Sequence, residues 1–210
     1  RRCTHSPPSP RASQSTSSAG RAFTAEALAK SQAGFMDTTL PMLDAVRDVI
    51  TDALPEHAPP ADTTVIAVQH QLGCHPAFVH SLGQVMGLAA DGWHRLHSVD
   101  IPYSSHASVQ ERLRAMGVTN IHTHSYSLSQ PYDAYQPGRV GELLHRVLTS
   151  STGPVVVVDD GAYAVSAMAK MPESLYAGRA AVVEQTARGI IKMREQPALG
   201  ELVAAAVPVR

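Results

Sequence analysis

Four consecutive valines, residues 155–158, run directly into Asp159, Asp160 and Gly161. A strand that is apolar along its whole length, rather than at every second residue, is typical of a parallel sheet covered on both faces. Such a strand can carry polar groups only where it leaves the core, so the two carboxylates mark its end. This segment indicates an α/β protein whose polar chemistry lies at one edge of a sheet.

The chain from about Phe35 onward alternates short apolar runs with helical patterns. Strands are predicted at 63–69, 95–101, 118–126, 154–158 and 179–183. Helices are predicted at 40–54, 75–90, 108–117, 138–148, 161–170 and 185–195. This alternation predicts a Rossmann-like three-layer α/β domain, in which a mostly parallel sheet of about five strands is covered by helices on both faces.

Residues 1–35 differ from the rest in composition. Their first 21 residues are rich in Ser, Pro and Arg and contain no acidic residue, so they cannot bury enough apolar surface to fold. We expect a disordered tail over residues 1–35 and one α/β domain over residues 36–210. The same composition also fits an organelle transit peptide.

The totals exclude several classes of function. A formal net charge of -1 gives no electrostatic reason to expect nucleic acid or an anionic membrane as a partner. No apolar run approaches the roughly 20 residues that a membrane-spanning helix needs. Cys3 and Cys74 form no disulfide framework, which fits a reducing compartment, and we expect a cytoplasmic protein.

Every predicted strand ends in residues that ionise or form hydrogen bonds. These residues are Gln69 and His70, Asp100, His122 and His124, Asp159 and Asp160, and Glu184 to Thr186. Ligands bind at the carboxyl ends of the strands in open parallel sheets, so a site is expected at this edge. One of the two adjacent aspartates can cap the next helix, which leaves the other free.

The eleven histidines raise the question of a metal. His122 and His124 would point to the same side of a strand. Zinc, however, needs at least three protein ligands. We therefore expect no metal site, and a histidine-based metal enzyme is the least favoured hypothesis for the function.

Two motifs near the C-terminal end resemble those of the S-adenosylhomocysteine hydrolases. "VVVVDDGAYAV" at 155–165 is similar to the family's strand ending in Asp-Asp-Gly-Gly-Asp, and "GRAAVVEQTARGIIKM" at 178–193 is similar to its Glu-Glu-Thr-Thr-Thr-Gly segment. Weaker matches precede them in the family's order, at 35–48, 68–82 and 98–105. The resemblance covers residues 35 to 210 and corresponds to the family's substrate-binding domain.

The resemblance implies roles for individual residues. His70 and Asp160 would be catalytic, working at the ribose of the substrate. Glu184 and Gln185 would bind substrate, although Gln185 stands where the family has a carboxylate. Thr186 would bind the NAD cofactor, whereas Ala187 and Arg188 stand where the family has two threonines that face the nicotinamide. The strand ends add Asp159 and Asp100 as substrate-binding candidates.

The leading hypothesis is thus the substrate-binding part of a divergent adenosylhomocysteinase-like, NAD-dependent hydrolase of one-carbon metabolism. It would bind a nucleoside or thioether-type small molecule and form a homo-oligomer. The family's NAD-binding domain is absent from this chain, so we expect the chain alone to be inactive. A non-catalytic nucleoside-binding or regulatory module on the same fold is the alternative.

Overall fold

The computed structural model describes residues 40–53, 59–88, 91–125, 131–196 and 199. The expected tail over residues 1–35 lies outside these residues. The strands are β1 (Thr64–Gln69), β2 (Leu96–Asp100), β3 (Asn120–His122), β4 (Val155–Asp159) and β5 (Ala180–Glu184). The helices are α2 (Pro41–Ala53), α3 (His75–Val85), α4 (Ala107–Ala115), α5 (Tyr132–Ser150), α6 (Tyr163–Met168), α7 (Glu173–Tyr176) and α8 (Ala187–Glu195). Two short 3₁₀ turns, η2 (Gly92–Arg95) and η3 (Pro102–Ser104), flank β2.

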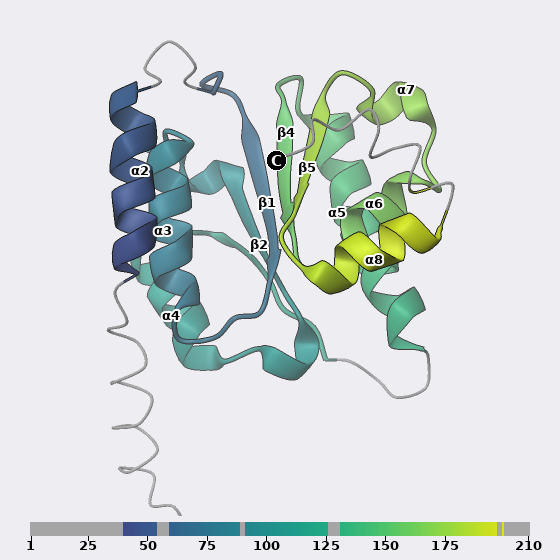
Figure 1. The fold of residues 1–210 in the computed structure, drawn as a ribbon, viewed down its shortest axis with the longest axis horizontal. Coiled ribbons are helices and arrows are strands. Elements are labelled where there is room, and N and C mark those ends of the chain that lie inside the picture. Colours follow the sequence, from purple (N-terminus) through teal and green to yellow (C-terminus); the bar gives the residue numbers. More distant parts are fainter. Residues whose placement is uncertain (1–39, 54–58, 89–90, 126–130, 197–198, 200–210) are drawn as a thin grey trace, which may run out of the picture.

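The five strands form one all-parallel sheet in the order β3-β2-β1-β4-β5. The chain therefore runs outward from the central strand β1 to β3, crosses back through α5, and then runs outward on the other side (Figure 1). The predicted Rossmann-like α/β fold is confirmed. The reversal of direction places a topological switch point between the carboxyl ends of β1 and β4, where such sheets bind ligands.

The two larger hydrophobic cores, one on each face of the sheet, hold the three layers together. On one face, Ile66, Val68 and Val157 of the sheet pack with α5, α6 and α7. On the other face, Val65 and Leu96 pack with α3 and α4. The alternation of neighbouring residues between the two cores is the two-residue period of a strand, and it requires strands that are apolar throughout.

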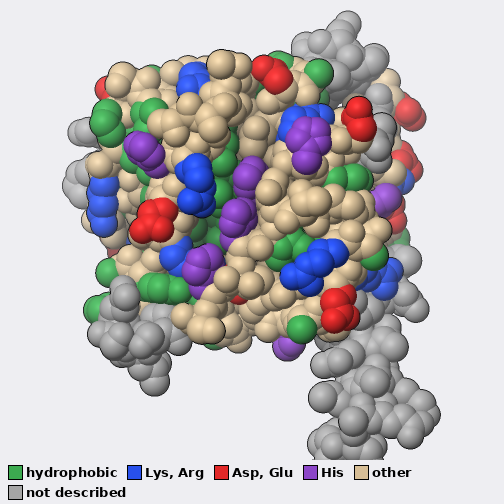
Figure 2. Space-filling model, turned by 180° about the vertical axis from the view of Figure 1, so that it is seen from behind, with side chains coloured by type: hydrophobic (Ala, Val, Ile, Leu, Met, Phe, Trp, Pro, Cys, Tyr) green, Lys and Arg blue, Asp and Glu red, His purple; other side chains and the backbone are tan. Residues whose placement is uncertain are grey.

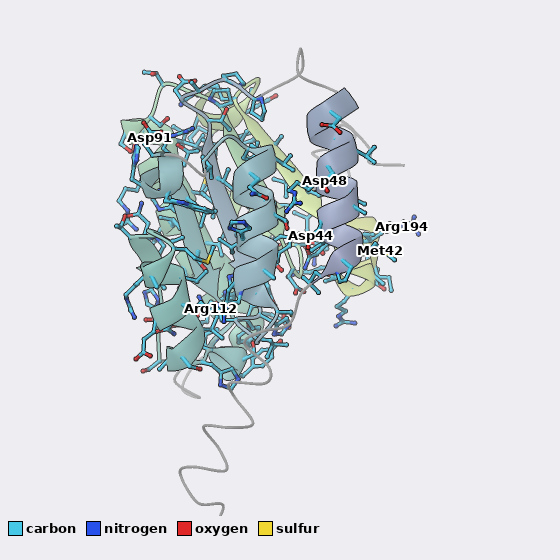
Figure 3. The ribbon with its side chains drawn as sticks, turned by 90° about the vertical axis from the view of Figure 1, so that its left-hand side faces the viewer. Met42, Asp44, Asp48, Asp91, Arg112 and Arg194 are labelled. Carbon is cyan, nitrogen blue, oxygen red and sulfur yellow. The ribbon has the colours of Figure 1, made fainter. Side chains whose placement is uncertain are left out.

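Helix α2 forms an outer element on the α3 side of the domain (Figure 3). The hydroxyl of Ser81 on α3 donates a hydrogen bond to Asp44 of α2 at 3.3 Å. Met42 on α2 is 81% exposed.

Some predicted boundaries were wrong. Helix α5 begins at Tyr132 rather than 138 and contains Pro137. Pro137 is the sixth residue of the helix, so its missing N–H removes a single backbone bond near the start. Strand β3 covers only Asn120–His122 of the predicted 118–126, and α7 was not predicted.

The α3–β2 side of the domain depends on a close approach of Trp93 to helix α3. A Cβ atom added at Gly83 would lie 2.3 Å from Trp93 Cη2, whereas one added at Gly138 of α5 would meet nothing within 4 Å. We expect Gly83→Ala to lower the free energy of unfolding by about 1–3 kcal/mol, because the partly buried indole must shift from its packing against the core of this face. The matched Gly138→Ala should raise it by up to about 1 kcal/mol through helix propensity. Urea unfolding of both variants measures this, and equal effects would contradict the packing described.

Candidate functional site

The carboxyl ends of β1 and β4 bring His70 and Asp160 together at the switch point. His70 follows β1, and Asp160 follows β4 directly. His70 Nε2 lies 3.7 Å from Asp160 Oδ2. Both side chains are partly accessible, at 32% for His70 and 15% for Asp160, so a ligand can reach this pair from solvent.

Ser104, in the 3₁₀ turn after β2, fixes the orientation of the His70 ring. Its Oγ lies 2.5 Å from His70 Nδ1 and donates to the carbonyl oxygen of Ile101 at 3.1 Å. Since the hydroxyl proton is used on Ile101, Ser104 oxygen accepts the hydrogen of Nδ1–H. This assigns the tautomer of the neutral ring and leaves the lone pair of Nε2 facing Asp160.

The ionisation of Asp160 is set by opposing influences. Burial raises the pKa of its carboxyl group, and the positive charge of the protonated form of His70 lowers it. Glu184 raises the pKa again, while a hydrogen bond from Gln185 lowers it. The Gln185 amide also donates to Gln69 Oε1 at 2.7 Å, so one side chain links the ends of β1, β4 and β5.

Asp159, the neighbour of Asp160, turns inward to the start of α6. Its Oδ2 accepts a hydrogen bond from the backbone N–H of Ala164 at 2.7 Å, and the residue is fully buried. Burial raises the pKa of its carboxyl group to about 7. Its Oδ1 has no hydrogen-bond partner among the described residues. Asp159 therefore holds α6 while Asp160 faces His70.

Glu184 at the end of β5 ties together the two turns that frame the edge. Its carboxylate accepts hydrogen bonds from the backbone N–H groups of Gly161 (3.2 Å), Ala162 (2.6 Å) and Thr186 (2.7 Å). Ala162 has a left-handed backbone with φ 56°, a conformation that costs about 1 kcal/mol or more in a residue with a Cβ. The bonds to Glu184 compensate for this strain, so Glu184 shapes the site.

Thr186 begins α8 and uses its hydroxyl twice. The hydroxyl donates to Glu184 Oε1 at 2.5 Å and accepts from the backbone N–H of Gly189 at 3.0 Å. This is an N-cap arrangement. The hydroxyl hydrogen, which the resemblance would make available to the NAD cofactor, is instead donated to Glu184.

Asp100, the remaining predicted substrate-binding residue, makes an ion pair away from His70 and Asp160. Its Oδ1 accepts from Arg139 Nη2 at 3.1 Å, and its side chain is only 1% exposed. The backbone N–H of His124 reaches its Oδ2 at 3.4 Å. The structure thus brings together His70, Asp160 and Gln185, and it places Asp100 in a separate group with Arg139.

An aromatic group beside the site was missed by the sequence analysis. Tyr103 lies with its ring centroid 5.5 Å from that of His70 and is 68% exposed. Its ring is 5.4 Å from that of Tyr132, which in turn meets Tyr163 at 6.1 Å. The signal was the Tyr-Ser pair at 103–104, directly after the end of β2.

The histidine-based metal hypothesis gains no support from this geometry. The described residues contain no group of three or more His, Cys, Asp or Glu side chains that could hold a metal ion. His97 and His122 instead face each other, with Nδ1 and Nε2 3.1 Å apart.

Fold and site together define a doubly wound α/β domain with a histidine–carboxylate pair at its switch point. No family model, curated protein or solved structure matches the chain. Within the described part of the chain, no helix combines the length and the apolar character required to cross a membrane.

The buried carboxyl group of Asp159 predicts a pH dependence of stability. Between the ordinary pKa of 3.8 and about 7, the unfolded chain releases this proton while the folded protein keeps it. The free energy of unfolding should therefore fall as pH rises through this window. Asp159→Asn keeps an acceptor for Ala164 but cannot ionise. Relative to the wild type, this variant should gain at least about 1 kcal/mol between pH 4 and pH 8, since one pKa unit corresponds to about 1.4 kcal/mol. Denaturant unfolding across pH measures the difference, with the exposed Asp91→Asn as control; parallel profiles for the Asp159 variant and the wild type would contradict the burial argument.

Proposed function

We propose that this domain binds a nucleoside or thioether-type substrate at the switch point, with a ribose-like diol held by His70 and Asp160. The observation that carries the proposal is the pair itself. His70 Nε2 and Asp160 Oδ2 are two hydrogen-bond acceptors 3.7 Å apart, with the His70 tautomer fixed by Ser104. Two acceptors at this separation do not bond to each other without a shared proton, whereas a diol supplies one O–H group to each.

The chemistry available to the pair is proton transfer at a hydroxyl. His70 Nε2 can accept a proton from a sugar hydroxyl, and Ser104 keeps the ring in position while it does so. Asp160, when ionised, accepts a charge-assisted hydrogen bond from the neighbouring hydroxyl. The amide of Gln185 favours the ionised form of Asp160, so it supports this role.

The resemblance to adenosylhomocysteinases extends the proposal to an NAD-dependent hydrolase acting in the cytoplasm as a homo-oligomer. When bound, NAD would supply oxidation of the ribose hydroxyl. Thr186, the one cofactor-side candidate in this chain, does not fit a donor role because its hydrogen is bonded to Glu184.

The alternative is a non-catalytic nucleoside-binding module on the same fold. The hydrogen bond from the Thr186 hydroxyl to Glu184 favours this alternative. It shares the binding site at His70 and Asp160 and differs only in turnover. An assay of adenosine turnover in the presence of NAD tests the alternative. If the protein binds adenosine and the adenosine is recovered unchanged, the result favours a non-catalytic module.

Loss of the Asp160 carboxylate tests the proposed site. Asp160→Asn in the full 210-residue chain should weaken adenosine binding by about tenfold to a hundredfold, the cost of one hydrogen bond to a charged group. His70→Gln should weaken it as well. Isothermal titration calorimetry measures both effects. Asp91→Asn is the matched control, because Asp91 is exposed and precedes β2 at the opposite edge of the sheet (Figure 3). Absence of adenosine binding to the wild type, or equal affinity of the Asp160 variant, would refute the proposal.

Tyr103 is positioned to stack on the base of such a nucleoside. Its exposed ring borders His70, and stacking of a base on an aromatic ring contributes about 1–3 kcal/mol. We expect Tyr103→Leu to weaken adenosine binding about tenfold while leaving binding of methyl riboside, which has no base, unchanged. Titration of both ligands against both proteins measures the difference. If Tyr103→Leu weakened the binding of adenosine and of methyl riboside by the same factor, Tyr103 would act on His70 and Asp160 rather than on the base, which would contradict this prediction.

A further inference from the structure

A polar pocket lies on the α5 side of the sheet, away from His70 and Asp160. It is bordered by His122 at the end of β3, His124 just after it, and Arg139 and Arg146 of α5. Helix α5 covers the middle of this face, where its valines and leucines pack on β1, β2 and β4. The outer strand β3 is left with polar side chains between itself and the helix. Figure 2, which shows the molecule from behind, has histidine side chains gathered near the middle of the face, with Lys or Arg side chains beside them.

Arg139 is a largely buried residue that lines this pocket. Its side chain is only 9% exposed. One terminal nitrogen donates to Gln136 Oε1 at 3.2 Å, and the other to Asp100 Oδ1 at 3.1 Å. Its Nε, however, is buried and has no hydrogen-bond partner among the described residues. A buried guanidinium N–H without a hydrogen-bond acceptor costs free energy, so a ligand that supplied an acceptor to this N–H would be stabilised.

Arg146 adds a second cation two turns further along α5. The guanidinium group of Arg146 makes no hydrogen bond or ion pair within the described part of the chain, whereas its backbone carbonyl accepts a hydrogen bond from Thr149. The positive charge of Arg146 nevertheless lowers the pKa values of His97 and His122. Burial, the largest cause, together with His122 and Arg146 lowers the pKa of His97 to about 4. The pKa of His122 is lowered first by burial and then by Arg146.

His124 presents an N–H donor in the pocket, while His122 is paired with His97. The rings of His97 and His122 are stacked, with centroids 5.3 Å apart, and they bond to each other. His124 Nδ1 contacts Arg139 Nη2, a nitrogen that can only donate. The neutral His124 ring therefore carries its hydrogen on Nε2.

We propose that this pocket binds a phosphate group, either as the free ion or as a phosphate monoester. Two guanidinium groups and a histidine N–H surround it, from α5 and from the segment after β3. Donors that converge from two elements suit an anion with several tetrahedrally arranged oxygens. A cation is disfavoured because the two arginines line the same space. This inference does not depend on the proposed nucleoside site.

The charges that face the pocket predict opposite effects for two exposed residues of α5. Among the described residues, His122, His124, Arg139, Glu142 and Arg146 line the pocket, and His97 and Asp100 of β2 contact this lining through His122 and Arg139. Asp100 is neutralised by Arg139. Glu142 lines the pocket and repels an anion. Removing the charge of Arg146 should weaken phosphate binding, and removing that of Glu142 should strengthen it.

The test is titration of the full chain with inorganic phosphate and with glycerol phosphate, against sodium chloride at matched ionic strength. Arg146→Gln should weaken binding about tenfold or more, as for loss of a hydrogen bond to a charged group, and Glu142→Gln should tighten it. Arg194→Gln, an exposed substitution on α8 at the other end of the sheet order, is the matched control and should bind like the wild type. Tighter binding of inorganic phosphate identifies the free ion as the ligand, and tighter binding of the ester identifies a phosphorylated molecule. Wild-type protein that binds neither, or variants that all bind alike, would overturn the proposal.

Nuclear magnetic resonance of the histidine rings supplies a readout that a purely structural role would not move. Bound phosphate stabilises protonated imidazole, so it should raise the pKa values of His122 and His124 in the wild type. The same addition should leave both pKa values unchanged in Arg146→Gln. Unchanged ring resonances in the wild type at saturating phosphate would place any binding elsewhere and overturn the proposal.

Discussion

The backbone of β1 has no access to water, and this constraint organises the rest of the domain. Every residue from Thr64 to Gln69 is buried. Each of its peptide groups must therefore find a partner within the sheet, and β2 and β4 supply these partners on its two sides. A strand held in this way accepts polar side chains only where it ends. His70 follows immediately, at the point where β1 and β4 part.

The two adjacent aspartates after the valine run show how the same constraint divides roles. Asp159 is still within the strand and turns into the protein, where it accepts the N–H of Ala164 at the start of α6. Asp160, one residue further, points to the other side and meets His70. The alternation of side chains along a strand thus assigns one carboxylate to structure and the next to the site. Glu184 repeats the structural role on β5, where it holds the turn of the left-handed Ala162.

The features that the sequence predicts are those set by local pattern. Continuous apolar runs identify β1 and β4, and the residues that follow them give His70 and Asp160. The contacts that complete the site are long-range and have no local pattern. Ser104 reaches His70 across 34 residues, and Arg139 reaches Asp100 across 39. Its position at a strand end alone therefore could not show that Asp100 lies apart from His70 and Asp160. The early start of α5 was hidden by Pro137, because a proline in the first two turns of a helix looks like a boundary in sequence.

The segment from Asp100 to Ser104 explains why the two polar regions coexist on one edge. The Asp100 side chain bonds to Arg139 at the base of the α5 pocket. Four residues later, Ser104 bonds to His70 and is itself anchored on the carbonyl of Ile101. Ile101, between them, is fully buried in the core beneath α5. A short stretch fixed by one apolar anchor thus orients a carboxylate toward one region and a hydroxyl toward the other. Because that anchor is packed in the core, charge changes at exposed Arg146 or at Asp160 leave the stretch in place, and each region can be examined without disturbing its neighbour.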